Sequence, residues 1–137
     1  MFAEGSYNQR LEIVADFPKG KAVWWFDKSD MRRVKQVLGN MARIAGNVGL
    51  DLMTAGTPDE VDAYCKELIE VVGKDGGFIL ANGCGVDHAK AENKRAMIEA
   101  GKKYGFIGRE VGNPCLPCLR AGRGTIGGRL VTAPPRL

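Results

Sequence analysis

Three apolar, strand-like segments, each followed by a helix-like segment, succeed one another in the first three quarters of the chain. The strand-like segments are 21–27 (KAVWWFD), 41–48 (MARIAGNV) and 77–82 (GFILAN). Strands that alternate with helices pair in parallel, because each helix carries the chain back to the start of the next strand. Nearly all residues in these segments are apolar, which is typical of parallel strands covered on both faces. The alternation predicts an α/β fold in which these strands lie parallel and adjacent in sequence order.

Capping and periodicity signals predict the intervening helices. The segment 57–60 (TPDE) combines a threonine cap, a proline at the first helical position and a glutamate that can bond back to the cap. We expect this helix to end at Gly73. Asp30 is predicted to cap a helix that ends near Leu38, and a third helix is predicted over 89–104.

The opening residues indicate a partial fourth unit. Residues 2–5 (FAEG) read as the end of a strand, and residues 7–17 as its helix or loop. Three to four parallel βα units are typical of part of a (β/α)8 barrel, whose functional side chains lie at the carboxyl ends of the strands. Those ends carry four candidate site residues, which we expect to meet on one rim: Glu4, Asp27, Asn47 and Cys84.

The composition changes near Gly105, which predicts a domain over 1–105 and an irregular tail over 106–137. Residues 1–105 hold 15 basic and 15 acidic side chains, whereas the tail holds five arginines, one glutamate and four of the six prolines. Because Phe106 is the only aromatic residue of the tail, we expect no nucleic-acid partner. The chain lacks an apolar run long enough to span a membrane, so we expect no membrane partner. Four scattered cysteines favour a reducing, cytoplasmic setting.

Each candidate residue has a functional and a structural interpretation. Cys84 lies between two glycines that leave it open to a ligand, and a thiolate there can bind zinc; it can equally be a small thiol that packs a turn. Asp27 is free to face a pocket, because Asp30 is the better helix cap. Asn47 can face the same pocket or bond its own backbone in a turn.

Two short motifs resemble the uroporphyrinogen decarboxylase superfamily, over about residues 2–105. They are Gly83-Cys84-Gly85 and Glu92-Asn93, and they look most like the corrinoid methyltransferases that act on thiols. The resemblance implies the C-terminal portion of a (β/α)8 barrel. It also implies an enzyme that moves a methyl group between a methylated small molecule and a corrinoid protein that carries cobalamin. The opening segment, with Arg10 and Leu11, looks more like the branch that acts on methoxylated substrates.

The resemblance also implies ligands and roles. The cysteine that matches Cys84 is a zinc ligand in those relatives, and the other ligands come from a His-x-Cys near the end of an earlier strand. The corresponding residues here are Phe2-Ala3-Glu4, so either Glu4 replaces them as an oxygen ligand or the site lacks zinc. Asp27 and Asn47 are the predicted catalytic residues.

Two other functions stay open at this point. One is uroporphyrinogen decarboxylation, although the Arg-rich motif and the early aspartate of that branch are absent from this sequence. The other is a non-catalytic small α/β protein that forms a homo-oligomer, because three or four βα units leave two sheet edges unpaired. As a barrel fragment, the chain alone is expected to be inactive.

Overall fold

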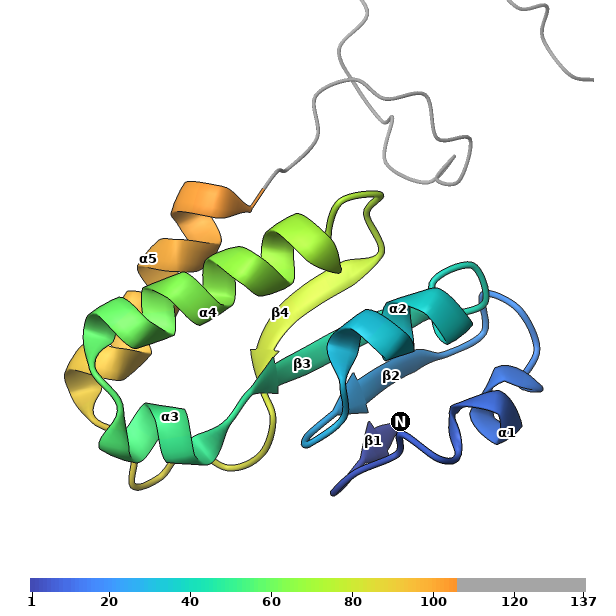
Figure 1. The fold of residues 1–137 in the computed structure, drawn as a ribbon, viewed down its shortest axis with the longest axis horizontal. Coiled ribbons are helices and arrows are strands. Elements are labelled where there is room, and N and C mark those ends of the chain that lie inside the picture. The colour runs from blue at the N-terminus through green and yellow to red at the C-terminus, as the bar shows by residue number, and fades with distance from the viewer. Residues whose placement is uncertain (106–137) are drawn as a thin grey trace, which may run out of the picture. The chain divides into compact units, whose positions relative to one another are not determined.

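The computed structural model describes residues 1–105 of the 137-residue chain, and the predicted tail over 106–137 lies outside this range. Nine elements follow one another in the order β1 (Phe2–Ala3), α1 (Leu11–Ala15), β2 (Val23–Phe26), α2 (Met31–Leu38), β3 (Arg43–Val48), α3 (Leu50–Ala55), α4 (Pro58–Val71), β4 (Phe78–Asn82) and α5 (Ala91–Tyr104). The strands form one parallel sheet in the order β1-β2-β3-β4 (Figure 1). The predicted parallel, sequential pairing is confirmed.

The helix α3 was not predicted from the sequence. It follows β3 after one residue, and Gly49, which has no side chain to act as a cap, precedes it. A helix of six residues offers neither a full apolar stripe nor a capping signature, so local sequence rules do not detect it. Its buried residue Met53 packs into the core, which indicates that tertiary contacts stabilise this helix.

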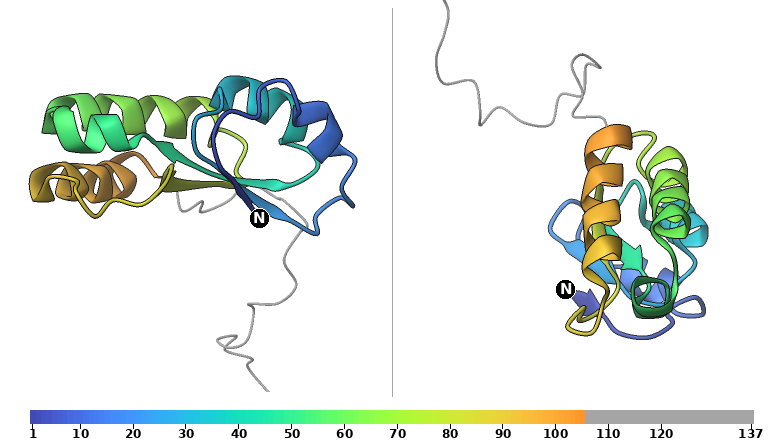
Figure 2. Two further views of the ribbon diagram at one scale, coloured as in Figure 1. Left: turned by 90° about the horizontal axis from the view of Figure 1, so that it is seen from below. Right: turned by 90° about the vertical axis from the view of Figure 1, so that its left-hand side faces the viewer.

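Alternation along β2 separates two faces of the sheet. Trp24 and Phe26 are buried, whereas Val23 and Trp25, on the opposite side, are exposed. Trp24 and Phe26 belong to a core that includes Ile44 from the sheet and several helix residues, among them Met31, Val34, Val61, Leu68 and Ala100. We call this side the covered face. Figure 2 shows α2 and α4 lying along the same side of the strands.

The other side of the sheet, which we call the open face, carries Phe2, Val23, Trp25 and Ile79. The strand register pairs Phe2 with Trp25 across β1 and β2, and places Trp25, Ala45 and Ile79 in one line across β2, β3 and β4. Phe2, Val23, Trp25 and Ile79 are all among the exposed large apolar residues. In a closed barrel this face points to the interior.

Specific polar contacts fix the helices. The predicted capping box of α4 is confirmed, because Thr57 and Glu60 bond each other's backbone amides. Asp30 caps α2 as predicted and accepts hydrogen bonds from the amides of Arg32 and Arg33. Within residues 1–105, no helix is long and apolar enough to cross a membrane.

Candidate functional site at the carboxyl edge of the sheet

The four predicted site residues lie at or just beyond the carboxyl ends of successive strands. Glu4 follows β1, Asp27 follows β2, Asn47 is the penultimate residue of β3, and Cys84 comes two residues after β4. Because all four strands are parallel, their carboxyl ends meet at one edge of the sheet. How close the side chains come to one another depends on the loops that follow each strand.

Asp27 lies between two of the loops at this edge. Its side chain is buried, and its Oδ2 accepts a hydrogen bond from the amide of Gly5 at 3.2 Å. Gly83 lies against its other carboxylate oxygen: a Cβ added to Gly83 would stand 2.8 Å from Asp27 Oδ1. A methyl group at Gly83 therefore has no room unless Asp27 moves. The carboxylate lies between the loop after β1 and the loop that carries Cys84.

Cys84 lies in the loop after β4 and is half-buried. Its Sγ is 3.7 Å from the carbonyl oxygen of Gly85. The Asn82 side chain donates to the Cys84 carbonyl, and the indole Nε1 of Trp25 donates to the Asn82 carbonyl at 2.6 Å. These bonds shape the loop from both sides, so the thiol is presented at the rim by residues of β2 and β4.

The second cysteine in this part of the chain has a different environment. Cys65, on α4, is fully buried, and burial raises the pKa of its thiol to about 11. At neutral pH this thiol is protonated and packs as a small apolar group. Cys84 is therefore the thiol that solvent and ligands can reach within residues 1–105.

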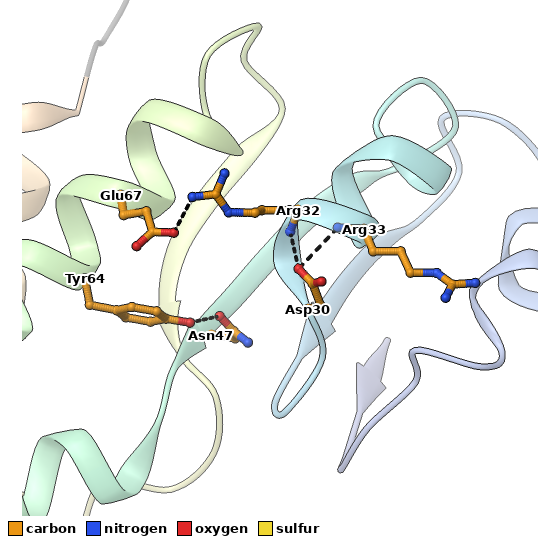
Figure 3. Close-up of polar contacts among 6 residues, drawn as sticks. All are labelled: Asp30, Arg32, Arg33, Asn47, Tyr64 and Glu67. Atoms are coloured by element: carbon orange, nitrogen blue, oxygen red, sulfur yellow. Dashed lines mark hydrogen bonds and ion pairs between the residues drawn. The ribbon is translucent and has the colours of Figure 1, made fainter.

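Asn47 is buried and hydrogen-bonds protein groups through both ends of its side-chain amide; Figure 3 shows its bond to Tyr64. Its Nδ2 donates to the backbone carbonyls of Asp27 at 3.0 Å and Ser29 at 2.8 Å, and its Oδ1 accepts from the Tyr64 hydroxyl at 2.9 Å. Burial raises the pKa of the Tyr64 phenol, so it stays a donor at neutral pH. This geometry makes Asn47 a positioning residue that ties the loop after β2 to α4, and its predicted catalytic role stays a prediction.

Ion pairs beside this network hold the neighbouring helices. Arg32 of α2 bonds Glu67 of α4 at 2.7 Å, and both side chains are exposed (Figure 3). An exposed pair of this kind contributes about 0–1 kcal/mol. A small hollow of about 180 Å³ lies between the two helices and is lined by Ser29, Tyr64 and Leu68 among others. This ion pair therefore adds little to the stability of the two helices.

Glu4 and Cys84, the predicted metal ligands, are not brought together in one chain. Glu4 is exposed and follows the edge strand β1, whereas Cys84 follows the opposite edge strand β4. Three strand spacings separate these strands, roughly 14 Å across a flat sheet. Within residues 1–105, no group of three His, Cys, Asp or Glu side chains is placed to hold a metal ion. The only histidine, His88, is exposed.

Several residues that shape this edge were missed by the sequence analysis. The amide of Gly5 holds Asp27, the carbonyl of Ser29 and the hydroxyl of Tyr64 hold Asn47, and Trp25 holds the loop of Cys84. No local pattern signals these roles, since each contact joins elements far apart in sequence. Asn93, of the Glu92-Asn93 motif, has a structural role: its Nδ2 donates to the carbonyls of Met53 at 3.1 Å and Gly56 at 2.9 Å and so ties α5 to α3.

Comparison with known proteins places this architecture in a family. The family described as uroporphyrinogen decarboxylase (URO-D) matches residues 1–104, and the chain belongs to this family. Among solved structures, a methyltransferase from Methanosarcina mazei is similar, with a TM-score of 0.63 and 27% sequence identity. The match covers 75% of this chain and 30% of that methyltransferase, so the chain spans about a third of its length. The predicted resemblance to this superfamily and the predicted fold class are thereby confirmed, and the chain is similar in structure to a methyltransferase.

Short stretches of the chain are also similar in sequence to ligases, a different class of enzyme. The chain is 36% identical over 52 residues to a UDP-N-acetylmuramoyl-L-alanyl-D-glutamate–2,6-diaminopimelate ligase from Chlamydia trachomatis, and 37% identical over 60 residues to the ligase of that name from Chlamydia abortus. They cover 38% and 44% of this chain but only 11% and 12% of the ligases. A match to so small a part of an enzyme does not indicate a shared activity.

Proposed function

We propose that this chain forms the C-terminal part of the barrel of a corrinoid-dependent methyltransferase. In this function a methyl group moves between a methylated small molecule and the cobalamin of a corrinoid partner protein. The observation that carries the proposal is the half-buried Cys84 thiol in its Gly-Cys-Gly loop, at the edge where barrel enzymes place their chemistry. Family membership and the likeness to a methyltransferase structure support it.

The reaction exchanges one bond for another. The bond from the methyl carbon to a substrate heteroatom would break with its electron pair left on the heteroatom, and the corrinoid of the partner protein, when bound, would accept the methyl group. The chain's part is to hold the substrate so that the heteroatom and its methyl group face the partner protein. We assign contact with the substrate heteroatom to Cys84. We assign the role of a fixed hydrogen-bond acceptor to the Asp27 carboxylate, which the Gly5 amide orients.

Zinc is the metal that the family resemblance implies, and the residues of one chain do not complete a site for it. A catalytic zinc site takes about three protein ligands. Cys84 offers one, Glu4 follows a distant strand, and residues 1–105 hold no cluster of three ligands. Cys84 is therefore a single candidate ligand, and one thiolate does not make a catalytic zinc site.

The test measures methyl transfer by the natural full-length protein that contains this sequence. Methylated thiols and methoxylated compounds are offered as donors, and methylation of the corrinoid is followed by its change in absorbance. We expect Cys84→Ala to abolish transfer while barely changing the unfolding midpoint, because the side chain is half-exposed and packs little.

A matched control variant tests whether the loss of activity is specific to Cys84 or follows the removal of any cysteine. Cys115→Ala removes a tail cysteine outside the described range and is expected to leave transfer unchanged. Full activity of Cys84→Ala would contradict the proposal. So would carbon dioxide release from uroporphyrinogen without methyl transfer, which would assign the chain to the decarboxylase branch.

A further inference from the structure

The loop that carries Cys84 does not fix the position of its own thiol. Gly83 and Gly85, on either side of Cys84, have no Cβ, so the backbone of this segment has access to many conformations. A thiol on such a segment points in one direction only if other groups hold the two peptide units that flank it. The contacts of these two peptide units therefore decide where Sγ lies.

The peptide unit between Asn82 and Gly83 is held at both of its polar atoms. Its carbonyl oxygen accepts a hydrogen bond from the indole Nε1 of Trp25 at 2.6 Å. Its N–H, on Gly83, donates to the carbonyl oxygen of Val48 at 2.8 Å. Because a peptide unit is planar, hydrogen bonds at its oxygen and at its nitrogen together fix the orientation of the plane. One of these bonds comes from β2 and the other from β3.

The peptide unit that follows Cys84 is held through the Asn82 side chain. The Nδ2 of Asn82 donates a hydrogen bond to the carbonyl oxygen of Cys84. The Cα of Cys84 thus lies between a peptide unit that Trp25 holds and one that the Asn82 side chain holds, and both determine the direction of the Cβ–Sγ bond. Since the Asn82 side chain can act in this way only while its own backbone stays in place, the second contact depends on the first.

The Trp25 side chain reaches Asn82 across the strand between them. Trp25 lies on β2 and Asn82 ends β4, with β3 in between. The register sets Trp25 beside Ala45 of β3, whose single methyl group leaves the indole room to extend toward the carboxyl edge. Within residues 1–105, β2 and β4 do not pair, so this bond joins strands that the backbone hydrogen bonds of the sheet leave unconnected.

The preceding residue provides a natural comparison. Trp24 is buried on the covered face, and its indole Nε1 has no hydrogen-bond partner within residues 1–105. The same side chain therefore occurs twice in succession, once with its N–H bonded near the rim and once with its N–H unbonded in the core. Changing either tryptophan to phenylalanine removes an indole, but only the change at Trp25 breaks a hydrogen bond.

We propose that Trp25 is a positioning residue for Cys84, which acts through Asn82 to fix the direction of the thiol. The consequence for methyl transfer rests on the proposed function, whereas the effect on the thiol itself does not. Without the indole N–H, the Asn82–Gly83 peptide unit can rotate, and the thiol spreads over several positions. A reaction that needs one orientation of the thiol is then slower, because fewer molecules hold it correctly at any moment.

Steady-state methyl transfer by the natural full-length protein tests the consequence for catalysis. Trp25→Phe keeps an aromatic ring and removes the N–H donor, and it should lower kcat about tenfold or more. The KM for the methyl donor should stay unchanged, since the bond holds the thiol and not the donor. Trp24→Phe is the matched control and should leave kcat unchanged, with circular dichroism to verify that both variants are folded. An unchanged kcat in Trp25→Phe, or equal losses in both variants, would overturn the proposal.

A double-mutant cycle tests whether Trp25 acts through Asn82. Asn82→Ala keeps the carbonyl that accepts from Trp25 but removes the side-chain amide that holds Cys84. In the Asn82→Ala background, Trp25→Phe should lower kcat little further, because the second contact is already lost. Losses that multiply would overturn the relay and would instead indicate direct contact between Trp25 and the substrate.

Alkylation of Cys84 separates this inference from the proposed function, because it needs neither a methyl donor nor a corrinoid. The rate with iodoacetamide is read from the mass of the peptide that contains Cys84. Trp25→Phe should raise this rate roughly two- to tenfold, the factor that one hydrogen bond provides. Cys65, which is fully buried, should stay unmodified and thereby shows that the fold is intact. Equal rates with and without the indole N–H would overturn the positioning role. Faster alkylation in a protein that lacks methyl transfer would support the positioning role and contradict the proposed function.

Discussion

The two faces of the sheet are built from neighbouring residues with opposite environments. Phe26 is fully buried on the covered face, while Trp25, one position earlier, is 36% exposed on the open face. Both are large aromatic residues, a type that is usually well buried. The strands carry large apolar residues on both sides, as in a sheet whose two faces are both covered. Within residues 1–105, however, helices cover only one of these faces.

The largest expected effect contrasts apolar truncations on the two faces. Phe26→Ala should lower the free energy of unfolding by about 3–5 kcal/mol, because it empties a packed site. Ile79→Ala should cost less than about 1 kcal/mol, since the side chain is half-exposed in a single chain. Urea unfolding of the two variants measures both losses. Equal losses would show that the two faces do not differ.

The second effect tests the polar network where the covered face reaches the rim. Asn47→Ala leaves two carbonyls and the Tyr64 hydroxyl without their partner, and should cost about 2–3 kcal/mol. Tyr64→Phe removes only one of those bonds and should cost about 1 kcal/mol. Thermal or urea unfolding of both single variants and the double variant gives the coupling between them. Additive losses would contradict a shared network.

The third effect tests the close approach of the Cys84 loop to Asp27. Gly83→Ala should cost about 1–3 kcal/mol, because the new methyl group would stand 2.8 Å from the Asp27 carboxylate. Gly85→Ala is the matched control: its methyl group would be 3.7 Å from Asp87, an ordinary contact. The unfolding midpoints of the two variants should therefore differ. If they agree, Gly83 and Asp27 are not in contact.

The smallest expected effect is the pH dependence of stability that comes from burying Cys65 on the covered side of the sheet. Burial raises the pKa of this thiol from 9.0 to about 11, so the unfolded chain loses the proton first as pH rises. The contribution of the protonated Cys65 thiol to the free energy of unfolding is fully present below pH 9. It falls between about pH 9 and 11, by about 1 kcal/mol at pH 10. Cys65→Ala should unfold with a shallower pH dependence over this range. An unchanged slope would show that the thiol is not buried.

Local signals in the sequence were sufficient for most of the fold. The strands over 43–48 and 78–82, and the capped helices α2 and α4, lie within two residues of their predicted bounds, because periodicity, Thr57 and Asp30 act on neighbouring residues. The helix α3 escaped prediction because its stabilisation comes from buried Met53 and from the Asn93 clamp of α5. The tail over 106–137 and the predicted domain boundary were not tested.

The candidate site was predictable only in part. The sequence identified the strands whose carboxyl ends carry Glu4, Asp27, Asn47 and Cys84, since parallel order follows from the alternation of strands and helices. It did not reveal that Asn47 faces Tyr64, because that contact joins β3 to α4 across 17 residues. Nor did it reveal that Glu4 and Cys84 end opposite edges of the sheet.

The sequence by itself determined the βα units, their parallel order and the family motif around Cys84, because these depend on residues a few positions apart. Only the tertiary structure decided which polar side chains are bonded within the protein and which reach the rim. It also decided that Trp25 and Ile79 stay exposed. The physical reason is that burial and hydrogen bonding depend on elements brought together from distant parts of the chain.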